Sequence, residues 1–185
     1  MKLWAISLCM LLLLSGCDAA SEMERGMALR SALQQSEGCT MDVEILADYG
    51  GFSDSFSMAC TFDRDGNLDF TVTKPDTISG IKGKIAGDKG QIVFDDTVLY
   101  YELMADGTIS PISGAWVFMK TLRSGYIRSA CMEGEQLRLT IDDSFEDGAL
   151  QVDAWLNSEN TPVCADILFG GSRIMSLNIK NLHIL

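Results

Sequence analysis

From Cys39 onward, hydrophobic and polar residues alternate along most of the chain. The clearest runs are 39–45, 56–62 and 68–72, and glycine-containing turn sequences separate them. Further runs follow at 78–85, 91–94, 98–103, 126–132, 136–141, 149–156, 163–169 and 173–179. Such alternation is typical of antiparallel strands that bury one face and expose the other. The pattern therefore predicts a meander of about ten strands.

Two segments depart from this alternation and predict helices. Ser21 and Glu24 have the spacing of a capping box, so a helix is expected from there to about Gln35. A second helix is predicted over 113–123, after a proline and before Gly125. Its bulky residues either fill the core or form a lid over an apolar ligand cavity; they are Trp116, Phe118, Met119 and Leu122.

The first 16 residues have the pattern of a secretory signal peptide. Lys2 precedes an apolar run at 3–14, which is shorter than the roughly 20 residues of a permanent transmembrane helix. Leu-Ser-Gly-Cys at 14–17 resembles the lipobox of bacterial lipoproteins, in which the cysteine carries diacylglycerol and becomes the first residue. The resemblance implies a mature chain that begins at Cys17 and is anchored at the outer face of the cell membrane.

The segment that follows the signal is strongly acidic. Lys2 is the only charged residue of the signal, so residues 17–185 contain 13 Lys and Arg against 26 Asp and Glu, a formal net charge of −13. Such a charge disfavours binding to nucleic acid or to anionic lipid headgroups. The length suits a single domain with its own hydrophobic core.

Four cysteines remain besides Cys9 in the signal and Cys17; they are Cys39, Cys60, Cys131 and Cys164. They form no C-x-x-C motif and have no nearby histidine, which disfavours a zinc site. Disulfides and free thiols are both compatible with an exported domain. A hairpin through the Gly-Gly turn at 50–51 brings Cys39 close to Cys60 or Phe62, so Cys39–Cys60 is the preferred disulfide.

The sequence contains no strong catalytic or metal-binding motif. His183 is the only histidine, and no nucleophile-elbow, metalloprotease or phosphate-loop motif occurs. The acidic turn at 63–69 lacks the glycine and glutamate positions of a calcium-binding EF-hand loop. The acidic loop at 142–147 is expected to be a solvated turn. We therefore expect no enzyme activity, no metal and no cofactor other than the diacylglycerol on Cys17.

Trp155 is a candidate for a partner-binding surface. The apolar residues of its predicted strand, at 150, 152, 154 and 156, all have the opposite parity. A one-sided strand would therefore expose the Trp155 indole, and exposed aromatic side chains are enriched where protein partners bind.

The order of helix, strands, helix and strands resembles the half-open barrel of the periplasmic lipoprotein carriers, the LolA/LolB group. The segment 162–167, followed by Gly-Gly-Ser-Arg at 170–173, is similar to the closing hairpin of that group. The resemblance implies an α+β, mostly β fold: a curved, incompletely closed antiparallel β-barrel of about ten strands, covered by two helices. It would form a single domain over residues 17–185.

Within this group, the segments 110–116 and 122–127 resemble the germination lipoproteins, GerS and its relatives. This resemblance implies a non-enzymatic scaffold that binds an envelope partner, such as a cell-wall amidase in spore germination. The alternative is a binder of a hydrophobic ligand, which would hold a lipid or a lipoprotein acyl chain between barrel and helices. An enzyme acting on cell-wall material is a third hypothesis, and it would require convergent carboxylates in one cleft.

Overall fold

The computed structural model describes residues 17–185, except 49–52, 88, 95–96, 106–107 and 147. The predicted signal peptide at 1–16 and the Gly-Gly turn at 50–51 lie outside the described residues. The elements are α2 (Cys17–Gln35), β1 (Gly38–Asp48), β2 (Ser53–Asp63), β3 (Leu68–Lys74), β4 (Lys82–Ala86), β5 (Lys89–Phe94), β6 (Thr97–Glu102), β7 (Met104–Ala105), β8 (Thr108–Ile109), the 3-10 helix η1 (Pro111–Ser113), α3 (Gly114–Ser124), β9 (Tyr126–Glu133), β10 (Gln136–Asp142), β11 (Leu150–Leu156), β12 (Pro162–Phe169) and β13 (Ser172–Ile184).

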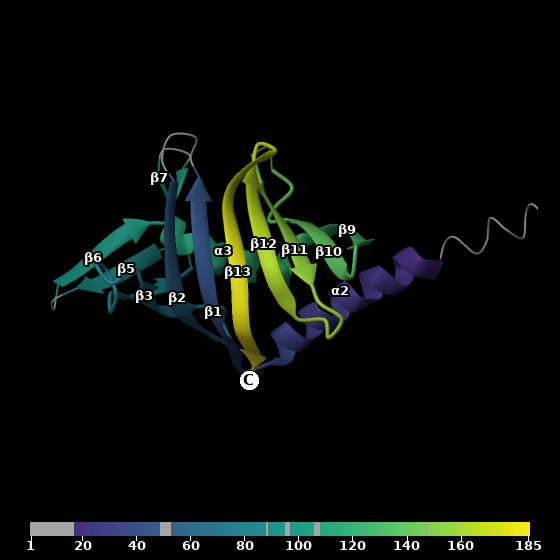
Figure 1. Cartoon of the computed structure of the whole chain (residues 1–185), viewed down its shortest axis with the longest axis horizontal. Coiled ribbons are helices and arrows are strands. Elements are labelled where there is room, and N and C mark those ends of the chain that lie inside the picture. Colours follow the sequence, from purple (N-terminus) through teal and green to yellow (C-terminus); the bar gives the residue numbers. More distant parts are fainter. Residues whose placement is uncertain (1–16, 49–52, 88, 95–96, 106–107, 147) are drawn as a thin grey trace, which may run out of the picture.

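One antiparallel sheet dominates the described part of the chain. It has eleven strands in the order β6-β5-β4-β3-β2-β1-β13-β12-β11-β10-β9, and β7 and β8 form a separate small pair. The last strand, β13, lies between β1 and β12 and so joins the two meanders into one sheet (Figure 1). The sheet is curled and does not close. The predicted half-open, mostly β barrel with two helices is therefore confirmed.

Both helices lie on one side of the curled sheet (Figure 1). The inner faces of the central strands carry the alternating apolar residues that the sequence indicated, and Val43, Ile45 and Met58 are buried there. The inner face of α2 contributes Leu29 and Leu33 to the same core. Each fully buried side chain of this size contributes about 1.5–3 kcal/mol, so the helices stabilise the sheet by covering it.

Besides the unpredicted pair β7 and β8 and the extension of β13 beyond residue 179, two elements begin elsewhere than predicted. The helix α2 begins at Cys17, so Ser21 and Glu24 lie within the helix and the predicted capping box does not mark its start. Alanines at 19 and 20 favour helix and allow this extension. The strand predicted from Ile78 begins only at Lys82, because the chain turns before it and Gly80 has a φ of +88°.

Candidate functional site

The exposed face of α3 forms a ridge on the side of the molecule where the barrel is open. Trp116 is half-buried there, and the Lys120 Nζ atom lies 5.2 Å from the centre of its ring. We call these two side chains the α3 ridge. The opposite face of α3 enters the core, where Phe118, Met119 and Leu122 are almost completely buried. Of the four helix residues predicted from the sequence, three therefore lie in the core, and Trp116 alone lies at the surface.

Two grooves flank the α3 ridge. The first, here called the apolar groove, has a volume of about 420 Å³. Its apolar lining is Leu103, Ile109, Trp116, Val117 and Leu150, and its polar lining is Lys89, Glu102, Lys120, Thr121 and Asp143. Residues from β6, β8, α3 and β11 meet here, so the groove exists only in the folded chain.

The second groove, here called the polar groove, has a volume of about 470 Å³. It lies between the C-terminal half of α3 and the turn that joins β2 to β3. Arg123 links the two elements, because its guanidinium donates hydrogen bonds to the backbone oxygens of Asp63 and Arg64 at 3.4 and 2.6 Å. Both grooves are bordered by Trp116 and Lys120.

Trp155 lies on the outer face of the sheet, opposite the helices, and its side chain is half-buried. Its Nε1 atom donates a hydrogen bond to Glu133 at 2.9 Å, and the Arg138 guanidinium lies 5.3 Å from its ring. Arg138 is opposite Trp155 in the register of β10 and β11, which explains why the indole is covered. Sequence parity predicted the correct face but not this neighbour.

The carboxylate of Asp153 lies beside the Trp155 cluster and was not singled out from the sequence. Its residue is only 3% exposed, and it accepts a hydrogen bond of 2.6 Å from Arg138. That bond to Asp153 raises the pKa of the Arg138 guanidinium, which stays charged. The ion pair between Arg138 and Asp153 links the neighbouring strands β10 and β11. Asp153 is opposite Thr140 in the register of β10 and β11, so its contact with Arg138 is diagonal and left no local signal in the sequence.

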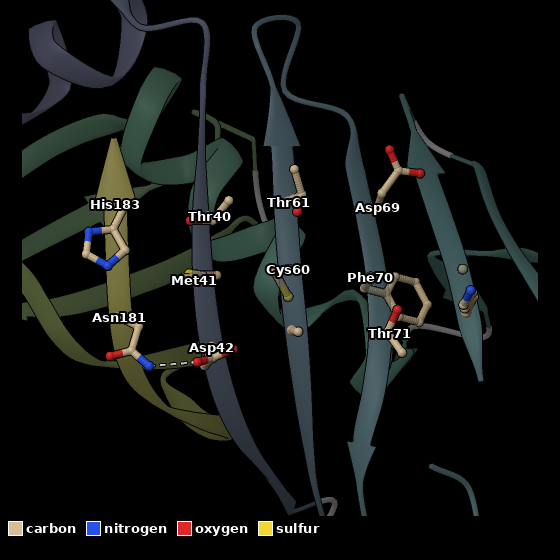
Figure 2. Close-up of a pocket in the computed structure, with 13 residues that line it drawn as sticks. Thr40, Met41, Asp42, Cys60, Thr61, Asp69, Phe70, Thr71, Asn181 and His183 are labelled. Carbon is tan, nitrogen blue, oxygen red and sulfur yellow. Dashed lines mark hydrogen bonds between the residues drawn. The ribbon is translucent and has the colours of Figure 1, made fainter. Parts of the chain in front are cut away.

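A hollow of about 480 Å³ crosses the outer face of β13 and β1–β4 (Figure 2). Small residues, Ala59 and Gly83, form part of its lining, and threonine hydroxyls project from neighbouring strands. Asn181 donates a hydrogen bond of 2.8 Å to Asp42 across it. His183 lies at one end of this outer hollow, in register with Thr40 of β1. The hollow offers exposed polar groups, and it is shallow compared with the helix-lined side.

Cys39 and Cys60 are buried free thiols, so the preferred disulfide is not formed in the structure. In the register of β1 and β2, Cys39 is opposite Phe62 and Cys60 is opposite Met41. The two cysteines are therefore diagonal neighbours, whose Cα atoms are typically about 7–8 Å apart, beyond the usual disulfide range of about 4.4–6.8 Å. Burial raises the pKa of the Cys39 thiol to about 11 and raises that of Cys60 further, which disfavours reactive thiolates.

The acidic turns have structural roles. The Asp63 carboxylate accepts hydrogen bonds from the Asn67 side chain and backbone, and the side-chain bond is the main reason that its pKa is lowered. Asp143 accepts a hydrogen bond of 2.8 Å from the backbone of Leu150. Within the described ranges, no group of three His, Cys, Asp or Glu residues is placed to hold a metal ion. Neither described helix is long and apolar enough to cross a membrane.

No family model and no curated protein matches this chain. Among solved structures, a putative outer membrane lipoprotein-sorting protein domain from Vibrio parahaemolyticus is similar, with a TM-score of 0.49 and 11% identity over 90% of this chain and 93% of that one. A LolA superfamily protein from Nitrosomonas europaea has a TM-score of 0.44 and 11% identity, with the same coverage of 90% and 93%.

A chain from the structure of the CwlD amidase of Clostridioides difficile in complex with the GerS lipoprotein has a TM-score of 0.40. It is 12% identical over 85% of this chain and 92% of that one. At such identities the likeness concerns the fold alone. The strand order and the two covering helices define an unclosed, mostly β half-barrel.

Proposed function

We propose that this chain is a non-enzymatic, membrane-anchored lipoprotein of the cell envelope that binds a partner protein through the α3 ridge. The observation that carries the proposal is the filled interior beneath that ridge. Phe118 and Met119 occupy the concave side of the sheet together with Leu122, so the bulk of α3 is core while Trp116 and Lys120 face outward.

The α3 ridge has the features of a protein-binding hot spot. A tryptophan that is half-buried between two grooves presents a large rigid surface at little cost in conformational entropy. The grooves on either side, of about 420 and 470 Å³, are large enough to receive side chains of a partner. Lys120 places a cation beside the indole in an otherwise acidic molecule, which favours a partner with an acidic or aromatic contact.

The resemblance to germination lipoproteins makes a cell-wall amidase the first partner to test. Residues 18–185, which contain every described strand and both helices except for one residue, would be titrated with the amidase of the source organism by calorimetry. We expect Trp116→Ala to raise the dissociation constant by about 30-fold or more. This is the effect of removing a hot spot worth about 2 kcal/mol.

Trp155→Ala is the matched control for this experiment. It removes a second half-buried tryptophan that also contacts a cation, but on the opposite face of the sheet. Binding that is insensitive to Trp116→Ala and lost with Trp155→Ala would place the partner on the outer face and refute the α3 ridge. Thermal unfolding of both variants would show that each is folded at the temperature of the titration.

The alternative function, binding of a hydrophobic ligand, is favoured by the apolar groove alone. Five apolar side chains line it, and Lys89 and Lys120 at its border could pair with an anionic headgroup. Native mass spectrometry of residues 18–185 purified from a membrane-containing host separates the two functions. A clean protein mass is expected for the partner-binding protein. A bound fatty acid or phospholipid in the wild type that is absent from Val117→Glu would instead support the ligand-binding function.

A further inference from the structure

The outer edge of β6 is open and unusually apolar. Among the described residues, no strand pairs with this edge of the sheet. Val98, Leu99 and Tyr100 are 45%, 58% and 78% exposed, and Val93 and Phe94 on the neighbouring strand are also exposed. In the register of β5 and β6, Leu99 lies beside Ile92 on the inner face, while Val98 lies beside Val93 on the outer face. The hairpin is therefore apolar on both faces.

This edge has little of the usual protection against pairing with another strand, because the only charged residue of β6 is Glu102 at its end. Natural edge strands carry charges, prolines or bulges, or are covered by another element. The residues from Thr97 to Tyr101 are all uncharged, in a mature chain with a net charge of −13. Alternate residues of an edge strand direct unpaired N–H and C=O groups outward, so β6 presents a template for an added strand.

We propose that β6 pairs antiparallel with β6 of a second copy of this chain, about a two-fold axis at Leu99. In this register Leu99 is opposite Leu99 of the partner copy on the inner face, and Val98 is opposite Tyr100 on the outer face. Each of these apolar side chains thus meets another apolar side chain. An isologous interface uses the same patch on both copies, so that patch must be complementary to itself. No like charges face each other from Thr97 to Tyr101, so the neutral stretch is complementary to itself despite the acidity of the molecule.

The position of the anchor is compatible with this pairing. The helix α2 starts at the end of the molecule that is far from β6 (Figure 1), so a lipid on the predicted first residue, Cys17, leaves the β6 edge free. Anchoring confines both copies to one membrane surface, which raises their effective concentration. Two copies are both acidic and repel each other, and at about 0.1 M salt this repulsion extends over roughly 10 Å. Self-association should therefore strengthen as the salt concentration rises.

A charge-exchange experiment tests the two-fold axis. Sedimentation velocity of residues 18–185 should show a concentration-dependent dimer. Leu99→Glu and Leu99→Lys should each raise the dimer dissociation constant at least about tenfold, because each places two like charges opposite each other. An equimolar mixture of the two variants should restore a dimer, since glutamate then faces lysine. Leu46→Glu, at an exposed leucine on the outer face of β1 away from the edge, is the matched control and should leave the dimer unchanged.

Several outcomes would overturn the proposal. They are a wild-type protein that stays monomeric at every concentration and salt, a dimer that survives Leu99→Glu, and a mixture of the two charged variants that stays monomeric. A dissociation constant that rises between about 0.05 M and about 0.5 M salt would also contradict it, because it indicates attraction between opposite charges. Binding of a cationic peptide at β6 by a monomeric chain would assign the edge to a different partner. None of these readouts depends on the amidase or on Trp116.

Discussion

The two edges of the sheet are treated in opposite ways. At β9, the helix α2 packs against the edge strand, and Arg25 Nη1 donates a hydrogen bond to Met132 Sδ. A Cβ atom on Gly26 would lie 2.8 Å from Leu139 Cδ2, so helix and sheet approach closely there. Arg25 and Asn160 exchange two hydrogen bonds of 3.0 Å, which tie α2 to the turn between β11 and β12. At β6, by contrast, apolar side chains stay exposed, and no strand in the described part of the chain pairs with the edge.

This contrast shows how a half-barrel separates stability from interaction. The covered edge buries apolar surface within one chain, so its residues contribute to the free energy of unfolding. The open edge contributes little to that free energy and remains available for a second chain. A leucine substitution at the covered edge should therefore change the free energy of unfolding. The same substitution at the open edge should change association with a second chain.

The largest effect on stability is expected at Leu139 in β10, the strand next to the β9 edge. Leu139 is fully buried beneath α2, so Leu139→Ala should lower the free energy of unfolding by about 2–5 kcal/mol. Leu99→Ala at the open edge removes the same atoms from an exposed position and should change it by less than about 0.5 kcal/mol. Urea unfolding at low protein concentration would measure both. Equal losses would show that the two edges are alike after all.

A smaller effect on stability is expected when a larger side chain is inserted between α2 and the sheet. Gly26→Val adds a branched side chain where the space is already filled by Leu139, and overpacking of this kind costs about 1–3 kcal/mol. Ala32→Val adds a similar side chain at an exposed position of the same helix and serves as the control. Hydrogen exchange should show faster exchange of β9 amides in Gly26→Val only. Unchanged protection of β9 would mean that α2 does not hold this edge.

The smallest effect is expected where β6 joins the core. The Tyr101 hydroxyl is buried with no hydrogen-bond partner, and burial raises its pKa to about 12 from 10.0, a rise that the nearby Ser113 hydroxyl opposes. Between pH 10 and 12 the unfolded chain loses this proton while the folded chain retains it, so stability falls as pH rises. Tyr101→Phe should remove that part of the fall, and should be neutral or stabilising by under about 1 kcal/mol at neutral pH.

The neighbouring tyrosine provides the control for this pH dependence. Tyr100→Phe leaves the buried Tyr101 hydroxyl in place, so this variant should retain the loss of stability that Tyr101 causes above pH 10. Urea unfolding at pH 8 and pH 11 would compare the wild type with both variants. A decline that persists unchanged in Tyr101→Phe would exclude this tyrosine as its source.

Much of the fold could be predicted because it follows from local patterns. The alternation at 39–45 and 56–62 identified β1 and β2, and the helical spacing around Trp116 identified α3 to within a residue at each end. The end of α2 at Gln35 was also predicted correctly. The start of α2 was not, because Ser21 and Glu24 match a capping box whether or not a helix continues before them.

The candidate site was less predictable. Helical spacing predicted Trp116 in the core or in a lid, and strand parity predicted an exposed Trp155, yet Trp116 borders two grooves and Trp155 is covered by Arg138. The difference depends on which strand lies beside each residue, and the register between distant strands does not appear in a local pattern. The diagonal placement of Cys39 and Cys60 has the same origin.

The sequence by itself determined the strands, the second helix and the acidity of this protein, and it predicts the lipid anchor at Cys17. These features depend on residues close together in the chain or on composition alone. Only the tertiary structure decided that α2 covers β9 and leaves β6 open, and that α3 fills the concave side while exposing Trp116. Those outcomes depend on packing between segments far apart in the sequence, where shape and register decide which apolar surface is buried.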